Sequence, residues 1–355
     1  MGAIQLIDAS GSAFSGGYGT VEAPYLISTP DQFLNIMNEE GMDQHYRLVN
    51  DLNFGGEEIL PLGCGTNSSD SEVYQEFTGT LDGDGFTIRD LKIASTINSG
   101  LFGKIGQGGV VKNLTLSNIE VNVSTSELGK SSATFTGGTL AGINNGTIDS
   151  CIVTDSQVIA KSNTTNEDAE RNVYHKYGGL VGVNAGQIRA VLVKDTTVDV
   201  FSHHNFEGAG TSSNQNNVFA GGVCGTSPGS LDYVGVNDGV VVKAHAKSEL
   251  NPKSTVNPYL KAYAGGIATQ EGLKMENVTN IYSDIQSDNV VAQRSLEINS
   301  GWGKHWKNAK TAEGDVFPSI KQAEIDNVTV DPQVVQDAFF VDETYEVTLS
   351  DKTEK

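Results

Sequence analysis

Long apolar runs, proline and positive charge are all scarce in this 355-residue sequence. No stretch of about 18 apolar residues exists, so we expect no direct insertion into a membrane. Charged residues make up 19% and aromatic residues 7% of the chain, and strong helix formers are few, which argues against helix bundles and coiled coils. Lys and Arg number 23 against 44 Asp and Glu, a net charge of −21 that repels phosphate backbones. We therefore expect no nucleic-acid partner.

Cysteine is also sparse, with Cys64, Cys151 and Cys224 at wide spacings and no CxxC pair. This pattern indicates neither a zinc site nor a disulfide framework. We interpret the three residues as small buried hydrophobes. The first residues (MGAIQLIDASGSAF) lack the basic and hydrophobic regions of a signal peptide, so for a secreted chain we expect the signal to have been removed.

A four-residue motif recurs at nearly constant intervals. Its five copies end at positions 103, 142, 182, 225 and 269, so the intervals are 39, 40, 43 and 44. A fixed period of this size is typical of repeat architectures in which each unit packs on its neighbours. The last copy has lost its final glycine to Thr269, as expected of a terminal repeat. The copies, called the glycine motif below, are GLFG (100–103), TLAG (139–142), GLVG (179–182), GVCG (222–225) and GIAT (266–269).

Each glycine motif leads into a short turn and then a segment with alternating apolar residues. In successive copies the apolar residues align position for position, which predicts ladders of like side chains about 4.8 Å apart in a parallel β-helix. The first copy supplies Val111, Leu114 and Leu116 in the same places. The ladders of the next three copies are Ile148, Ile188 and Leu231; Cys151, Val191 and Val234; Val153, Val193 and Val236; and Val158, Val198 and a valine near 241.

The repeat length and the two ends suggest a domain organisation. A period near 40 is long for one coil, so each repeat is predicted to supply two coils, giving about a dozen coils and a rod on the order of 55 Å. Thr29 as N-cap and Pro30 at the first helical position predict a short capping helix. Trp302, Trp306, Phe317, Pro318 and Ile320 predict a C-terminal cap. We expect a lead-in and cap over 1–47, the β-helix over 48–310, and a C-terminal cap with an extended tail or linker over 311–355.

The order of these segments resembles the GLUG-motif proteins, which occur in large bacterial surface proteins, adhesins and the N-terminal regions of some IgA-protease-like polypeptides. The lead-in strings TVEAPYLISTPDQFLNIMN, YRLVNDLNF, LPLG, FTGTLDGDGFTIRDLKI and SGLFGKIG precede the repeats, and the resemblance covers roughly residues 19–285. It implies an all-β, right-handed parallel β-helix, consistent with the usual hand of parallel crossovers. It implies no catalytic residues.

Few residues point to chemistry. Asp82 and Asp84 in LDGDG imitate the start of a calcium loop, but the later ligands of an EF-hand are missing. A tight turn with positive φ explains these residues better, and calcium stays a weak candidate ligand. The chain has no GxSxG, HExxH or phosphate-binding loop, so we expect no catalytic residues and no resident cofactor.

Four polar stretches interrupt the ladders at one phase of the repeat: Thr125–Ala133, Lys161–Asn172, Ser202–Asn217 and Lys247–Pro258. Insertions at one phase of a solenoid project from one side, so we expect a strip of loops that could bind a ligand. Solvated insertions without a function are the alternative. The third stretch carries a cluster that looks exposed. The candidate ligand-binding residues are Glu167, Asp168, Arg171, His203, His204, Asn205, Phe206 and Glu207.

These observations favour a non-enzymatic module of a bacterial surface or secreted protein, acting as a rigid spacer or as a ligand-presenting part of an adhesin. We expect its partner to be a protein or glycan of a host or neighbouring cell, and the chain to be part of a larger polypeptide. Two alternatives stay open, a polysaccharide-active β-helix enzyme with paired outward carboxylates and a segment of a phage or virion fibre.

Overall fold

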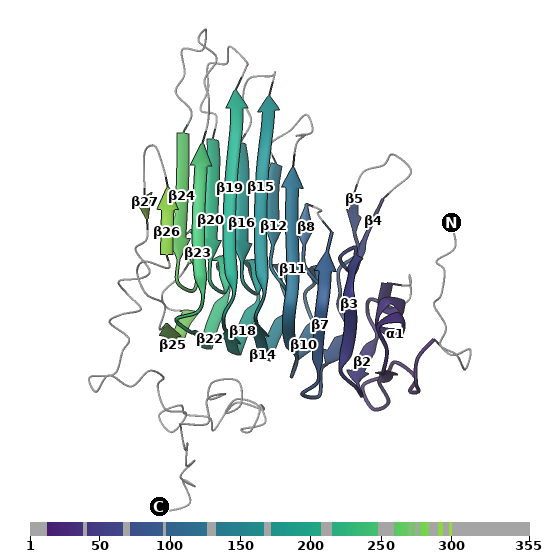
Figure 1. The fold of residues 1–355 in the computed structure, drawn as a ribbon. Coiled ribbons are helices and arrows are strands. Elements are labelled where there is room, and N and C mark those ends of the chain that lie inside the picture. Colours follow the sequence, from purple (N-terminus) through teal and green to yellow (C-terminus); the bar gives the residue numbers. More distant parts are fainter. Residues whose placement is uncertain are drawn as a thin grey trace, which may run out of the picture.

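The computed structural model describes residues 13–37, 41–66, 72–94, 97–125, 133–166, 172–206, 215–247, 259–269, 271–273, 277–283, 290–293 and 298–299. The predicted C-terminal cap and the tail over 311–355 lie outside these ranges. The described chain is a β-solenoid of stacked coils with one short α-helix near its N-terminal end (Figure 1).

Each complete coil contains four strands, and equivalent strands of successive coils pair in parallel. The first two stacks join into one 15-stranded sheet, which also includes β1 (Tyr25–Ile27). The first stack is β2 (His45–Leu48), β6 (Thr80–Asp82), β10 (Val110–Lys112), β14 (Thr147–Thr154), β18 (Gln187–Val193), β22 (Ser230–Val236) and β25 (Val278–Ser283). The second is β3 (Leu52–Ile59), β7 (Thr87–Ile93), β11 (Thr115–Thr125), β15 (Gln157–Asn166), β19 (Thr197–Phe206), β23 (Val241–Lys247) and β26 (Val290–Gln293).

The other two stacks close each coil. One forms a six-stranded sheet and the other a four-stranded sheet. A two-stranded antiparallel pair, β4 (Cys64–Thr66) and β5 (Glu72–Tyr74), stands outside the repeat. The third stack is β8 (Asn98–Ser99), β12 (Ala133–Gly137), β16 (Asn172–Gly178), β20 (Gln215–Gly221), β24 (Tyr259–Gly265) and β27 (Ile298–Asn299), and the fourth is β9 (Phe102–Ile105), β13 (Ala141–Asn144), β17 (Val181–Asn184) and β21 (Cys224–Thr226).

The predicted ladders line the interior. Val111, Ile148, Ile188 and Leu231 are direct neighbours in register and are fully buried. Burial of such side chains stabilises the fold by about 1.5–3 kcal/mol each. The residues of the other predicted ladders are also paired in register and buried. The valine predicted near 241 is Val242, the register partner of Val198.

One repeat forms one coil. Because Ile148 pairs directly with Ile188, no second coil lies between consecutive repeats. The prediction of two coils per repeat is therefore wrong, and with it the estimate of about a dozen coils and a rod of about 55 Å. The physical reason is the length of the strands: β11 has 11 residues and β15 and β19 have 10 each, so a single wide coil uses the whole repeat.

The N-terminal cap is confirmed. The helix α1 (Pro30–Leu34) begins after Thr29, whose side-chain oxygen accepts a hydrogen bond from the Gln32 backbone N–H at 3.3 Å. It continues into a 3-10 turn, η1 (Asn35–Met37). Phe33 is fully buried and packs edge-on against Phe54 of β3, with ring centroids 6.1 Å apart. The helix thus covers apolar side chains at the N-terminal end of the solenoid, where α1 is drawn in Figure 1.

Two columns of left-handed residues bend the 15-stranded sheet. These non-glycine residues have φ between 44° and 56°, a conformation that Asn and Asp tolerate best. Each column places one residue per coil at the same point, so the bend repeats along the solenoid. The first column is Asn113, Ser150, Ala190 and Tyr233, and the second is Asp90, Asn118, Asp155 and Asp195.

A ladder of buried amides links neighbouring coils in the fourth stack. The Nδ2 atom of Asn144 donates to Oδ1 of Asn184 at 2.8 Å, and Nδ2 of Asn184 donates to Oγ of Ser227 at 3.0 Å and to the Ser230 carbonyl at 3.1 Å. Both asparagines are fully buried. A buried amide must be hydrogen-bonded to avoid a desolvation cost, and here each coil satisfies the next.

Replacing Asn184 by alanine is expected to lower the free energy of unfolding by about 2 kcal/mol, since the Asn144 amide loses its acceptor at 2.8 Å and keeps only the longer hydrogen bond, at 3.3 Å, to the Gln187 carbonyl. Denaturant titration followed by circular dichroism measures the change. The control is Asn145→Ala, at a half-buried neighbouring turn position, where we expect a change below about 0.5 kcal/mol. Equal effects at the two positions would show that the amide ladder contributes nothing specific.

Candidate functional site

A bulge in β3 creates the one irregularity in the pairing of the second stack among the described strands. The register between β3 and β7 shifts between Asn53 and Glu57, where Gly55 and Gly56 adopt φ of 62° and 85°. Glycine reaches these angles without the strain that a side chain would bring. The Oδ1 atom of Asn53 accepts a hydrogen bond from the Gly55 N–H at 2.8 Å, which fixes the start of the bulge.

The bulge lies beside the second left-handed column. Asp90 of β7 and Asn118 of β11 are the column members next to it, and the Asn118 Nδ2 donates to Asp90 Oδ1 at 2.8 Å. Two residues further along the same strands, the Lys92 ammonium lies 3.8 Å from Glu120 Oε2. The bulge, the hydrogen-bonded pair and the ion pair thus come from three neighbouring strands.

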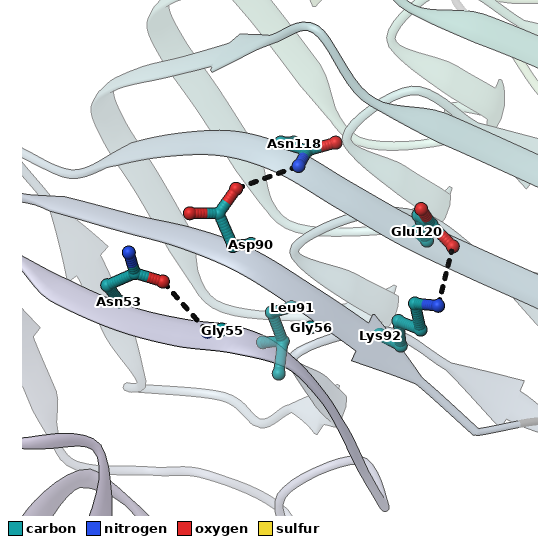
Figure 2. A pocket seen from close by; sticks show the side chains of 8 residues that line it. All are labelled: Asn53, Gly55, Gly56, Asp90, Leu91, Lys92, Asn118 and Glu120. Atoms are coloured by element: carbon teal, nitrogen blue, oxygen red, sulfur yellow. Dashed lines mark hydrogen bonds and ion pairs between the residues drawn. The ribbon is translucent and has the colours of Figure 1, made fainter.

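Together these groups line a surface pocket of about 370 Å³, called the bulge pocket below (Figure 2). This volume lies near the lower end of the range that holds small molecules. An added Cβ at Gly55 or Gly56 would meet no atom within 4 Å, so the pocket is open on the side of the bulge. The lining residues are Asn53, Gly55, Gly56, Asp90, Leu91, Lys92, Asn118 and Glu120.

The bulge pocket was not predicted from the sequence, although one signal was present. A pair of glycines inside an otherwise strand-like segment (LNFGGEEI) is typical of a bulge. The polar residues that complete the pocket come from strands 28 or more residues away, and only the register of the coils brings them together.

The predicted loop strip lies mostly outside the described residues. Glu167, Asp168, Arg171 and Glu207 belong to segments 167–171 and 207–214 and are not described, whereas His203, Asn205 and Phe206 form the end of β19. The strands that lead into the four polar stretches, β11, β15, β19 and β23, do pair side by side in parallel. Two of the predicted stretches begin too early, because β15 continues to Asn166 and β19 to Phe206.

His204 was expected in an exposed cluster, and this expectation is wrong. Its side chain is fully buried, and its Nδ1 lies 2.6 Å from the Thr164 hydroxyl of the neighbouring coil. The cause is strand alternation: β19 places Val198, Val200, Ser202 and His204 in turn toward the interior, whereas His203 is half-buried.

A second imidazole lies inside the same part of the solenoid. His175 of β16 is 1% exposed and stacks on Phe135, with ring centroids 5.2 Å apart. No hydrogen-bond partner is found for either ring nitrogen within the described ranges. Burial, and secondarily the nearby His204, lowers the pKa of His175 from its ordinary value of 6.5 to about 3. His175 is therefore held uncharged at neutral pH.

The candidate calcium residues form the turn that the sequence favoured. Asp84 has φ of 49°, and its backbone N–H donates to Oδ1 of Asp82 at 3.0 Å. The Asp82 carboxylate also accepts from Asn113 Nδ2 at 3.0 Å and lies 3.2 Å from the Lys112 ammonium. The Asp82 oxygens are thus held by protein donors. In the described part of the chain, no group of three or more His, Cys, Asp or Glu could hold a metal ion.

Two cysteines behave as predicted. Cys151 and Cys224 are buried, and Cys151 occupies its place in the apolar ladder between Leu114 and Val191. Burial raises the pKa of the Cys151 thiol to about 12 and raises that of Cys224 as well, so neither thiol is a nucleophile at neutral pH. Cys64 is only half-buried and departs from the expectation.

Comparison with known proteins finds relatives that match only part of this chain. No family model matches the chain. A curated protein of Evansella cellulosilytica, "Putative Gly-rich membrane protein", is 35% identical over 153 residues, which cover 41% of this chain and 16% of that protein. "Halomucin" of Haloquadratum walsbyi is 35% identical over 144 residues, 37% of this chain and 1% of halomucin. The chain thus spans a small part of the curated relatives it matches.

Among solved structures, a "putative immunoglobulin A1 protease" from Bacteroides ovatus aligns with 81% of this chain and 88% of its own, at 16% identity and a TM-score of 0.29. A score of this size supports no argument about the site. In the residues that the structure describes, no helix is long and apolar enough to cross a membrane.

Proposed function

We propose that the chain is a non-enzymatic, GLUG-type module of a bacterial surface or secreted protein, which acts as a rigid spacer and presents ligand-binding segments. The observation that carries this proposal is the side-by-side pairing of β11, β15, β19 and β23. Each of these strands precedes one of the four polar stretches. Binding residues are commonly mounted on segments that a rigid scaffold positions, and four such segments leave neighbouring strands here.

The scaffold has the rigidity that presentation needs. β15 and β19 stay in register from the Gln157–Thr197 pair to the Asn166–Phe206 pair. The first inward-facing residues of β19, Val198 and Val200, are apolar and buried. Further along the same strand, the buried Ser202 hydroxyl donates to Asn216 Oδ1 at 2.8 Å, which links the second stack to the third. This hydrogen bond links the two strands, β19 and β20, that flank residues 207–214.

The relatives support a module of a longer surface protein. Their names refer to a Gly-rich membrane protein and to a halomucin, and the matched parts are 16% and 1% of their lengths. For this chain we propose an extracellular or cell-surface location and, as partner, a protein or glycan of a host or neighbouring cell. The net charge of −21 favours partners that are neutral or basic.

The test replaces residues 207–214 with a Gly-Ser segment of equal length. The thermal midpoint is expected to stay unchanged, because the paired residues of β19 and β20 on both sides are kept. Binding to host cells or to a glycan array is expected to fall about tenfold or more, a loss of about 1.4 kcal/mol. The control is Gln107→Ser, an exposed turn residue between β9 and β10. Full binding by the 207–214 variant would remove this segment from the proposal.

A polysaccharide-cleaving enzyme is the second candidate, because Asp90 and Glu120 bring two carboxylates into the bulge pocket. Each already has a partner, Asn118 for Asp90 and Lys92 for Glu120, which fits a binding role better than proton transfer. Release of reducing ends from a polysaccharide panel by the purified chain, and its loss in Glu120→Gln, would favour the enzyme.

A further inference from the structure

The bulge pocket has a lining that mixes hydrogen-bond donors and acceptors. Asn53 uses its Oδ1 to hold Gly55, which leaves its Nδ2 as a donor, and Asn118 uses its Nδ2 to hold Asp90, which leaves its Oδ1 as an acceptor. No other partner of these two amides is found within the described ranges. Glu120 and Lys92 add acceptors and a donor, with side chains that are 29% and 47% exposed. Figure 2 shows the side chains around one opening.

This chemistry selects among ligand classes. Two carboxylates disfavour an anion, and the Lys92 ammonium disfavours a divalent cation, which prefers a site built of oxygen ligands alone. A lining of five polar side chains and no aromatic ring disfavours an apolar ligand. Hydroxyl groups both donate and accept, so a neutral ligand with several hydroxyls can use every group of the lining.

Asp90 and Asn118 belong to the column that repeats from coil to coil, but the bulge and the Glu120 carboxylate belong to the first coils alone. The register partners that follow Glu120 from coil to coil are Gln157, Thr197 and Val241. The next coil therefore has no carboxylate at this position, and by β23 the residue is apolar. Among the described strand pairs of the second stack, only that of β3 and β7 carries a register shift. The repeat alone therefore does not account for the pocket.

We propose that the bulge pocket is a binding site for one or two residues of a neutral saccharide. The hydroxyls of the sugar hydrogen-bond to Asp90, Asn118, Glu120 and Asn53, and the left-handed glycines leave room for the ring. The site is separate from the segments that the proposed function assigns to ligand presentation, so each proposal can fail without the other.

The left-handed column supplies matched variants for the test. Asn118→Gly and Asp90→Gly remove a lining side chain while glycine keeps the positive φ of 53° or 56°. Asp155→Gly makes the same change at φ 52°, one coil further on and outside the pocket. Any loss of stability that comes from the column itself should be the same in all three variants, which thermal unfolding measures.

The probes are neutral tetrasaccharides of glucose, galactose, mannose and N-acetylglucosamine, titrated into the full chain by calorimetry and saturation-transfer NMR. We expect one or more of these probes to bind with a Kd on the order of 0.1–1 mM. The affinity is expected to fall at least about tenfold in Asn118→Gly and in Asp90→Gly, and to stay unchanged in Asp155→Gly. Replacement of 207–214 should leave this binding intact.

Three results would overturn the proposal. One is binding by none of the neutral probes. Another is equal weakening in Asp155→Gly, which would place the effect in the backbone column. The third is selective binding of an acidic saccharide that Lys92→Met abolishes, which would make the pocket an anion site. If Asp90→Gly does not fold, Asn118→Gly decides alone.

Discussion

Replacing Gly182 by alanine is expected to lower the free energy of unfolding by about 3 kcal/mol. This value is at the upper end of what an added methyl group costs in a well-packed interior. Gly182 ends the third copy of the glycine motif. A Cβ there would lie 2.5 Å from the Gly137 nitrogen, 2.6 Å from the Lys176 carbonyl oxygen and 2.7 Å from the Gly142 oxygen. All three are backbone atoms, so no rotamer change relieves the contact. Denaturant titration measures the loss.

The control is Val183→Ala on the same strand, where the side chain is half-buried and points away from this contact. We expect it to cost about 1 kcal/mol or less. Gly225 has the same surroundings one coil further on, where an added Cβ would lie 2.5 Å from the Tyr177 nitrogen, so Gly225→Ala should behave like Gly182→Ala. A change at Gly182 no larger than at Val183 would refute close backbone approach as the reason for the motif.

Lowering the pH from 7 to 4 is expected to remove about 3 kcal/mol of stability through His175 alone. The folded chain holds His175 neutral with a pKa of about 3, whereas the unfolded chain takes up a proton near pH 6.5. Below pH 6.5 the unfolded state therefore binds more protons, and stability falls by about 1.4 kcal/mol per pH unit until the folded pKa is reached. Denaturant titrations at several pH values measure the slope.

Carboxylates also titrate over part of this range, so a variant must isolate the imidazole. His175→Phe keeps an aromatic ring against Phe135 and removes the titrating group. We expect the variant to lose the part of the slope that lies between pH 6.5 and 5, where most carboxylates are still ionised. Identical slopes in the two proteins between these pH values would contradict the assignment to His175.

The interior of the solenoid could be predicted from the sequence because it rests on periodicity. Ile148, Ile188 and Leu231 align by position in the chain, and alignment in the chain becomes contact in space when every repeat makes one coil. Thr29 and Pro30 predict the capping helix for an equally local reason, since capping involves only nearby backbone groups.

The features that were missed depend on strand length and on distant neighbours. The sequence does not show how long β15 and β19 are, so the repeat was divided into two coils. For the same reason His204 was placed in a loop, although it lies in β19 and continues the inward alternation of that strand. The bulge pocket needs the register that sets Asp90 beside Asn118. The ligand-binding role of the loop strip stays a prediction for four of its candidate residues, Glu167, Asp168, Arg171 and Glu207, which lie outside the described residues.

The one-repeat coil also restricts how such a chain can change in length. Ile188 pairs with Ile148 on one side and with Leu231 on the other. Duplication of a whole repeat would add one rung, extend the axis by about 4.8 Å and keep every column aligned. A partial duplication would break the left-handed columns and the amide ladder together. Apart from changes within the polar stretches, growth and shortening by complete units is therefore the change of length that preserves the interior.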